Sequence, residues 1–191
     1  MMNHVSALAY EAVHGHDDRA AWLKDLPWAH EPYYRFLRLM ARSCKYMVEI
    51  GTRLGTSAAH LADGNRDGTV LTIDIDPSCA VVMNQIASEQ GLVNLKAVTI
   101  ESSKGASLIE QPIDLLFLDG DHTYVSAYTD YLTYRPHVRE GGLIVFDDPN
   151  LSGEMQRVWD RVVDEKILLP ELHHSGFGVA CKRLVNTPLE L

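Results

Sequence analysis

The sequence predicts an α/β fold with a doubly wound, mostly parallel sheet. From residue 46 onward, short apolar runs alternate with helical segments, which is the pattern of a parallel sheet with helices on both faces. The last two apolar runs are separated only by a polar break at residues 174–176. This break is too short for a helical crossover and predicts an antiparallel last strand. Because the 191 residues contain no internal repeat or low-complexity linker, we expect one domain over residues 1–191.

The predicted elements divide into an N-terminal helical segment, residues 1–45, and an α/β core, residues 46–184. Apolar spacing at Val5 to Ala12 and at Tyr33 to Ala41 predicts two N-terminal helices, separated around Pro27. The seven strands are expected at 46–50, 70–75, 95–100, 113–119, 141–148, 167–174 and 176–184. The core helices are expected at 56–62, 80–90, near 107, at 124–134 and at 155–163.

Composition excludes several classes of protein. The chain is 46% apolar and 23% charged, which is typical of a globular protein, and it has no apolar run that could span a membrane. Its net charge of −9, without a basic cluster, argues against nucleic acid as a partner. The N-terminus lacks a secretory signal, so we expect a cytoplasmic location. Cys44, Cys79 and Cys181 form no CxxC pair and are interpreted as reduced structural thiols.

The residues that follow each strand are the candidates for function, because ligands gather at the carboxyl ends of the strands in such sheets. After the first strand, Gly51 and Gly55 allow a close approach to a ligand, although the spacing is neither GxGxxG nor that of a phosphate loop. After the second strand, Asp74 is the candidate acceptor for ribose hydroxyls, whereas Asp76 before Pro77 fits a helix cap. After the third, Glu101-Ser102-Ser103 supplies hydroxyls that could reach an adenine edge, although Ser and Glu are also common at strand ends without a ligand.

The densest group of acidic residues follows the fourth and fifth strands. Asp119 and Asp121 follow one strand, and Asp147 and Asp148 end the next, so several carboxylates are expected in one crevice. Carboxylates a few ångströms apart raise one another's pKa unless a cation lies between them. Mg²⁺ prefers oxygen ligands of this kind. The alternative is that Asp121 and Asp147 cap helices or loops.

Four motifs together resemble those of class I S-adenosylmethionine-dependent methyltransferases: EIGTRLGTSA, TIDIDP, IDLLFLDGDH and GGLIVFDD. More closely, the chain is similar to small metal-dependent O-methyltransferases of the catechol and caffeoyl-coenzyme A type, and to the branch that acts on macrolide sugars. The resemblance covers residues 34–183 and implies a Rossmann-like seven-stranded fold. It also implies S-adenosylmethionine as methyl donor, a divalent cation such as Mg²⁺, a small hydroxylated acceptor and a homodimer.

The resemblance also implies roles for individual residues. A cation would lie on Asp119, Asp147 and Asp148, and His122 would be the base that deprotonates the acceptor. His122 and Asp148 match the macrolide-sugar branch, since catechol-type enzymes carry lysine and asparagine there. The implied donor-binding residues are Glu49, Gly51, Gly55, Ser57, Asp74, Ile75, Ser103 and Asp119.

Other residues that invite a functional interpretation are assigned to structure. We expect Tyr124, Tyr128 and Tyr131 to pack against the sheet, because they recur at helical spacing. His173 and His174 are expected to be exposed near a turn. Three aromatic residues precede the first strand: Trp28, Tyr33 and Tyr34. Two interpretations of them stay open, closure over the donor and packing of the N-terminal helix.

Three alternatives to a metal-dependent O-methyltransferase remain. One is a metal-independent O- or N-methyltransferase in which His122 acts alone. Another is a catalytically silent homologue that binds the donor and serves as a partner subunit. The third, a nicotinamide-dependent oxidoreductase, is disfavoured by the spacing of Gly51 and Gly55.

Overall fold

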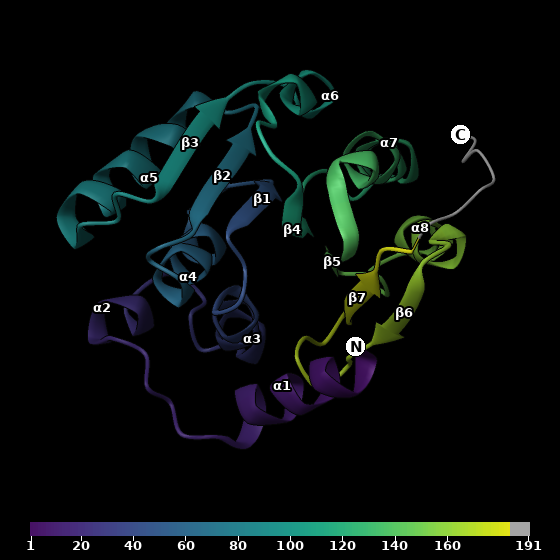
Figure 1. The fold of residues 1–191 in the computed structure, drawn as a ribbon, viewed down its shortest axis with the longest axis horizontal. Helices are drawn as coiled ribbons and strands as arrows, with labels where there is room; N and C mark the ends of the chain where they lie inside the picture. The colour runs from purple at the N-terminus through teal and green to yellow at the C-terminus, as the bar shows by residue number, and fades with distance from the viewer. Residues whose placement is uncertain (184–191) are drawn as a thin grey trace.

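The computed structural model describes residues 1–183 and has one seven-stranded sheet between helical layers (Figure 1). The strand order is β3-β2-β1-β4-β5-β7-β6, with β7 antiparallel to both of its neighbours and the remaining pairs parallel. The predicted fold class is therefore confirmed. The strands are β1 Tyr46–Ile50, β2 Thr69–Asp74, β3 Leu95–Thr99, β4 Ile113–Leu118, β5 Val138–Asp147, β6 Glu165–Leu168 and β7 Phe177–Cys181.

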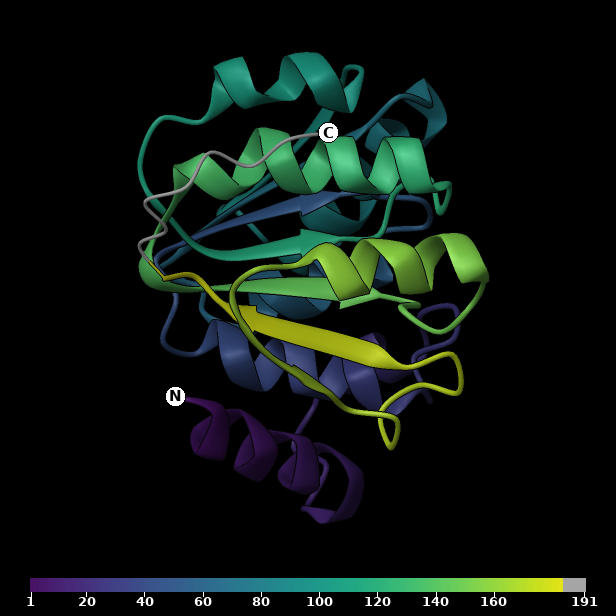
Figure 2. The same ribbon diagram turned by 90° about the vertical axis from the view of Figure 1, so that its right-hand side faces the viewer.

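The helices cover both faces of the sheet. In Figure 2, α1 and α3 lie below the sheet, while α7 and α8 lie above it. The α-helices are α1 Met2–His14, α2 Ala21–Lys24, α3 Pro32–Ala41, α4 Thr56–Gly64, α5 Pro77–Gln90, α6 Ser102–Gly105, α7 Tyr124–Tyr134 and α8 Gly153–Arg161. Single 3₁₀ turns follow α6 and α7 at Ala106–Leu108 and Arg135–His137. The sequence pattern did not predict α2, whose four residues are too few to show a period.

The central strand β1 is buried on both faces, as expected of a parallel strand between two helical layers. Met47 belongs to the hydrophobic cluster under α1 and α3, whereas Val48 and Ile50 belong to the cluster under α7 and α8. Because side chains alternate along a strand, Glu49 faces the same layer as Met47. A carboxyl group is thus enclosed within the fold directly behind the first loop.

The N-terminal segment is attached to the core through α3. Val5, Ala9 and Ala12 of α1 are buried in the same cluster as α3. The guanidinium of Arg35 donates hydrogen bonds to the carbonyl of Ala12 at 2.5 Å and to carbonyls just beyond the end of α1. These bonds satisfy acceptors that the end of a helix leaves unpaired.

The predicted sixth strand is wrong in its position. The prediction was 167–174, but β6 is Glu165–Leu168, and the chain then turns between Leu169 and Gly176. Pro170 lacks the N–H needed to continue a strand ladder, and Gly176 has φ +83°, which reverses the chain before β7. Of the residues predicted as strand, 167–168 lie in β6 and 169–174 form the β6–β7 turn, at the carboxyl end of β5.

Some remaining predictions can be compared with the described residues. Cys44, Cys79 and Cys181 are all buried and unpaired, so the prediction of structural thiols is confirmed. None of the helices in residues 1–183 combines the length and apolar composition that a membrane span requires. The predicted core boundary at residue 184 and the chain end at 191 lie outside the described residues.

The aromatic ring of Phe177 gives a test of the packing between β7 and α3. It is fully buried, and its centroid lies 5.2 Å from Tyr33, 5.9 Å from Phe36 and 5.8 Å from Phe117. We expect Phe177→Ala to lower the free energy of unfolding by about 3–5 kcal/mol, because it leaves a cavity in this cluster. Chemical denaturation measures the loss. The half-exposed Val163→Ala is the control, and an equal small loss in both variants would contradict the packing.

Candidate functional site

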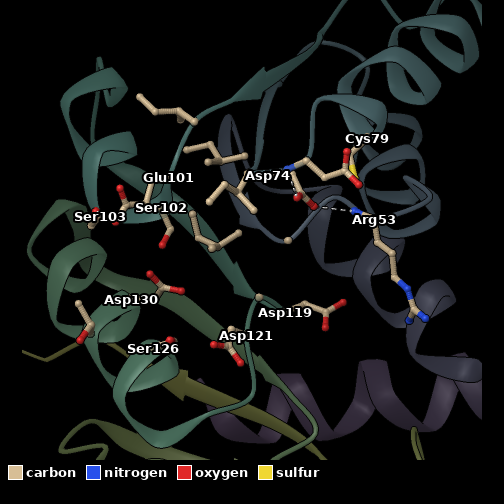
Figure 3. Close-up of a pocket in the computed structure, with 18 of the residues that line it drawn as sticks. Arg53, Asp74, Cys79, Glu101, Ser102, Ser103, Asp119, Asp121, Ser126 and Asp130 are labelled. Carbon is tan, nitrogen blue, oxygen red and sulfur yellow. Dashed lines mark hydrogen bonds between the residues drawn. The ribbon is translucent and has the colours of Figure 1, made fainter.

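Two cavities open at the carboxyl edge of the parallel strands. The first has a volume of about 700 Å³ and lies between the ends of β2, β1 and β4 and helices α6 and α7 (Figure 3). The second, of about 350 Å³, lies between the first loop, α3, the end of β5 and the β6–β7 turn. Arg53 and Asp119 line both cavities. The two spaces therefore meet at the ends of β1 and β4.

The loop after β1 approaches the end of β4 closely, and Gly51 makes this possible. Gly51 has φ +96°, and a Cβ there would collide with the backbone carbonyl of Asp119. Gly55 is the N-cap of α4 with φ +77°, a conformation that L side chains rarely adopt. The glycines that the sequence singled out thus shape the boundary between the two cavities.

Asp74 holds this loop in place. Its Oδ2 accepts hydrogen bonds from the backbone N–H groups of Thr52 at 2.9 Å and Arg53 at 3.0 Å, and its Oδ1 accepts one from Asp76. Burial opposes ionisation, but these donors outweigh it, so the pKa of Asp74 is lowered. Figure 3 shows the bond to Arg53 at the edge of the first cavity. The carboxylate is ionised at neutral pH, lines this cavity and fixes the adjacent loop.

The other walls of the first cavity combine apolar and hydroxyl groups. Ile75 and Val125 are 71% and 70% exposed, although both line this cavity, so they present apolar surface to any molecule inside it. Ser103 also lines it and donates a hydrogen bond to Glu101 at 2.8 Å. The sequence did not single out Val125 or the buried, cavity-lining Asp130, because both lie within α7 without a distinctive motif.

Carboxylates and imidazoles line the second cavity together. Asp147 ends β5, and Asp148 follows it with φ +58°. Burial raises the pKa values of Asp119 and Asp147, the charge of Asp148 adds to the rise in both, and Asp119 adds to that of Asp147. Burial also disfavours ionisation of Asp148, but His173, Ser175 and His122 outweigh it, so the pKa of Asp148 is lowered. The site therefore crowds three carboxyl groups together, and burial disfavours the ionised form of Asp119 and Asp147 unless a further cation is present.

Two imidazoles flank Asp148. His122 lies with Nε2 3.5 Å from Asp119 Oδ1 and Nδ1 3.5 Å from Asp148 Oδ2. His173 Nδ1 lies 2.9 Å from Asp148 Oδ1. The adjacent carboxylates, Asp119 for His122 and Asp148 for His173, raise the imidazole pKa values. The expectation that His173 is exposed is wrong, because the β6–β7 turn encloses its side chain in this cavity. His174 is exposed as expected, at the rim of the same cavity.

The donor set fits a divalent cation. Among the described residues, two groups have ligand atoms within 4.8 Å of one another: Asp119, His122 and Asp147, and Asp147, Asp148 and His173. Asp147 Oδ1 and Asp148 Oδ1 are buried and have no hydrogen-bond partner within the described structure. Buried carboxylate oxygens without partners are costly, and a cation between them would remove that cost.

Backbone strain also concentrates at the second cavity. Within residues 1–183, the three non-glycine residues with positive φ are Trp28 at 55°, Arg53 at 46° and Asp148 at 58°, and all three line this cavity. Such conformations cost about 1–3 kcal/mol each and persist where the surroundings impose them. Arg53 is held partly by its guanidinium, 4.6 Å from the centre of the Trp28 ring. The strain identifies this cavity as a site with constrained geometry.

The predicted site residues divide between the cavities. Gly51, Asp74, Ile75, Ser103 and Asp119 line the first. Gly55, Ser57, Asp119, His122, Asp147 and Asp148 line the second. Glu49 lines neither of them, because it is fully buried behind the loop, where its Oε2 accepts a 2.5 Å hydrogen bond from Thr72 Oγ1.

Most of the structural interpretations, such as helix capping and core packing, agree with the structure, but not all of them do. Asp76 caps α5 by accepting from Ser78 N–H, as predicted. Asp121 accepts from the N–H and hydroxyl of Thr123 before α7, so it matches the capping interpretation, whereas Asp147 does not. Tyr128 and Tyr131 are buried against the sheet, as expected, and Tyr124 is half-buried beside Tyr128. Tyr33 and Tyr34 are both buried in the core under α1 and line the second cavity.

Comparison with known proteins assigns the chain to a family. The family model described as a methyltransferase domain matches residues 48–149, more than half of the chain. An uncharacterised protein of Acanthamoeba polyphaga mimivirus is 31% identical over 112 residues, which is 53% of this chain and 50% of that protein. A candidate O-methyltransferase of Mycobacterium sp. (strain JLS) is 33% identical over 91 residues, 44% of this chain and 41% of that protein. The chain thus spans half or less of these curated relatives.

Solved structures share the fold. A candidate caffeoyl-CoA O-methyltransferase from Staphylococcus aureus has a TM-score of 0.72 at 15% identity, covering 85% of this chain and 88% of that one. The O-methyltransferase TomG from Streptomyces achromogenes, solved with S-adenosylmethionine, has a TM-score of 0.67 at 19% identity, covering 93% and 88%. At these identities the likeness concerns the fold.

The buried Glu49 predicts a pH dependence of stability. Burial raises its pKa from about 4.5 to about 8 in the folded chain. Between those values the folded state holds a proton that the unfolded state has released, so stability falls as pH rises. We expect the difference in unfolding free energy, wild type minus Glu49→Gln, to decrease from pH 4.5 to 8 by at most about 1.4 kcal/mol per pH unit.

Denaturation curves at several pH values measure this difference. The exposed Glu140→Gln is the matched control. A constant difference for Glu49→Gln across the same range would show that Glu49 is ionised in the folded protein.

Proposed function

The chain belongs to the methyltransferase domain family, and from this premise we propose that it transfers the methyl group of S-adenosylmethionine to a hydroxyl oxygen of a small molecule. The donor occupies the first cavity and the acceptor the second. One observation carries this assignment: the two cavities meet at Asp119, between a loop suited to a nucleoside and a cluster of carboxylates and imidazoles. A methyl transfer needs such a junction, because donor and acceptor must be held in line.

The lining of the first cavity supports the placement of the donor. The ionised Asp74 at the end of β2 accepts from ribose hydroxyls in addition to the loop N–H groups, since a carboxylate has about four acceptor positions. Ile75 and Val125 supply apolar surface for the adenine, and Ser103 lies on the same wall. The carboxyl group of Asp119 lies at the junction, where its ionised form would favour the positively charged sulfur.

The second cavity supports a small acceptor. Its volume of about 350 Å³ is near the lower end for small-molecule sites. The rings of Trp28, Tyr33 and Tyr34 form part of its lining, so a planar or partly apolar acceptor is compatible with it. We propose that His122 removes the proton from the acceptor hydroxyl, because its buried Nε2 has no hydrogen-bond partner among the described groups.

We propose that Asp119, Asp147 and Asp148 hold a divalent cation beside the acceptor. When bound, such an ion lowers the pKa of a hydroxyl that it contacts and so favours the nucleophilic form. The unpartnered oxygens of Asp147 and Asp148 support this assignment. In this proposal the carboxylates also orient the acceptor through the ion.

Asp74→Ala tests the donor site. The variant loses the carboxylate that orders Thr52 and Arg53 and faces the ribose, so we expect S-adenosylhomocysteine to bind about tenfold more weakly or worse. Isothermal titration calorimetry measures the dissociation constant. The exposed Asp67→Ala is the control, and unchanged affinity in Asp74→Ala would remove Asp74 from the donor site.

Asp147→Asn tests the proposed cation. We expect chelator to abolish methyl transfer by the wild type and excess divalent ion to restore it. We expect kcat/KM of the variant to fall about 100-fold or more, while the affinity for S-adenosylhomocysteine changes less than about threefold.

A methyl-transfer assay over a panel of hydroxylated and amine acceptors, with and without chelator, separates the alternatives. Turnover that chelator leaves unchanged would identify a metal-independent methyltransferase. Donor binding without transfer to any acceptor would identify a silent homologue.

A further inference from the structure

The β6–β7 turn places the side chain of His173 in the second cavity. Neither the sequence motifs nor the proposed methyl transfer assigns this residue a role. His173 is the only residue of this turn with a ligand atom in the two candidate metal-binding groups of the described residues. Its side chain is 12% exposed, so the imidazole is enclosed and not a surface group. Two other parts of the fold contact it, and the position of its Nδ1 is therefore well defined.

The backbone and an aromatic ring fix His173. The N–H of Gly176 donates to the carbonyl of His173 at 2.9 Å, closing a tight turn in which Gly176 has φ +83°. The N–H of Asn150, which follows Asp148, donates to the carbonyl of Ser175 at 2.8 Å. This bond ties the turn to the loop after β5. The ring of Tyr33 contacts the imidazole edge-on, with centroids 5.1 Å apart.

The Nδ1 atom of His173 faces two carboxylate oxygens that lack partners. It lies 2.9 Å from Asp148 Oδ1 and 3.8 Å from Asp147 Oδ1. These are the same two buried oxygens that accept no hydrogen bond within residues 1–183. The hydroxyl of Ser175 lies 3.4 Å from Nδ1, at the long limit of a hydrogen bond. One nitrogen and two oxygens thus converge on one point.

We propose that His173 is a metal ligand through Nδ1, together with Asp147 and Asp148, and that this site prefers a first-row transition ion such as Mn²⁺ over Mg²⁺. The inference rests on the proposed function, because it concerns the cation of the same site. Two ligand atoms at right angles, each about 2.1 Å from an ion, lie about 3 Å apart. The 2.9 Å between His173 Nδ1 and Asp148 Oδ1 matches this spacing, and the 3.8 Å to Asp147 Oδ1 corresponds to a wider angle at the ion. Mg²⁺ favours oxygen ligands, whereas an imidazole favours transition ions.

This assignment also separates the two histidines by role. His122 lies on the opposite side of Asp148, near Oδ2, whereas His173 lies near Oδ1. An ion held by His173 leaves Nε2 of His122 unligated and able to accept a proton from the acceptor. His173 then selects and holds the ion, and His122 remains the base.

Electron paramagnetic resonance of the full chain with Mn²⁺ tests the proposal directly. Electron spin echo modulation detects ¹⁴N coupling when an imidazole nitrogen binds Mn²⁺. We expect this coupling in the wild type and in His122→Asn, and its loss in His173→Asn. In a parallel titration we expect His173→Asn to weaken Mn²⁺ about tenfold or more and Mg²⁺ by less than about threefold.

Two further variants exclude a purely structural role. His173→Asn keeps a polar group of similar reach, and His173→Ala removes it; loss of the ¹⁴N coupling in both, with an unchanged circular dichroism spectrum, supports ligation. His174→Ala removes the exposed neighbouring imidazole and is expected to leave the coupling and Mn²⁺ affinity unchanged. Absence of ¹⁴N coupling or of Mn²⁺ binding in the wild type, or unchanged coupling in His173→Asn, would overturn the proposal.

Titration of the same samples with S-adenosylhomocysteine separates this proposal from the proposed function. Binding of S-adenosylhomocysteine without ¹⁴N coupling would overturn the role of His173 alone. Failure of the wild type to bind S-adenosylhomocysteine would instead contradict the proposed donor site, whatever the metal titration gives.

Discussion

The structure depends above all on the crowding of buried carboxyl groups at the ends of β4 and β5. Asp119 and Asp147 are largely enclosed, with pKa values raised by burial, and Asp148 follows directly in a strained conformation. The fold has to hold these carboxylates together despite their repulsion, and the surrounding loops supply two imidazoles for this purpose. Two buried oxygens still have no partner among the described residues. A site that holds acidic groups at this cost is suited to a cation.

The first loop depends on the same region from the other side. Gly51 approaches the carbonyl of Asp119 so closely that no side chain fits, and Asp74 holds the loop by its N–H groups. The first cavity and the carboxylate cluster therefore meet across this backbone contact. Asp74 has an architectural part in this arrangement, since it holds the loop that lies between the two cavities. The buried Glu49 lies behind this loop and bonds to Thr72, the residue paired with it on β2.

Much of the fold was predictable from local patterns. β1 was predicted at its observed bounds, and so was α7, because a buried strand and a helix with regular spacing are recognisable without knowledge of their neighbours. The motifs after the strands located Asp74, Asp119 and Asp147 at one edge, since parallel strands end on the same side. Short elements were harder: α2 has too few residues for a period, and the position of β6 was wrong because the apolar residues around Pro170 pack in a turn.

The sequence by itself determined the α/β class, the order of the loops and the acidic residues that end the strands. These follow from periodicity and from the rule that strand ends carry the ligand-binding groups. Only the tertiary structure decided which groups face one another. His173 lies 25 residues after Asp148, and no local pattern links them; they meet because β7 pairs antiparallel with β5 and the turn before it is tied to the loop after Asp147. Such a contact depends on long-range hydrogen bonds, which a sequence motif does not encode.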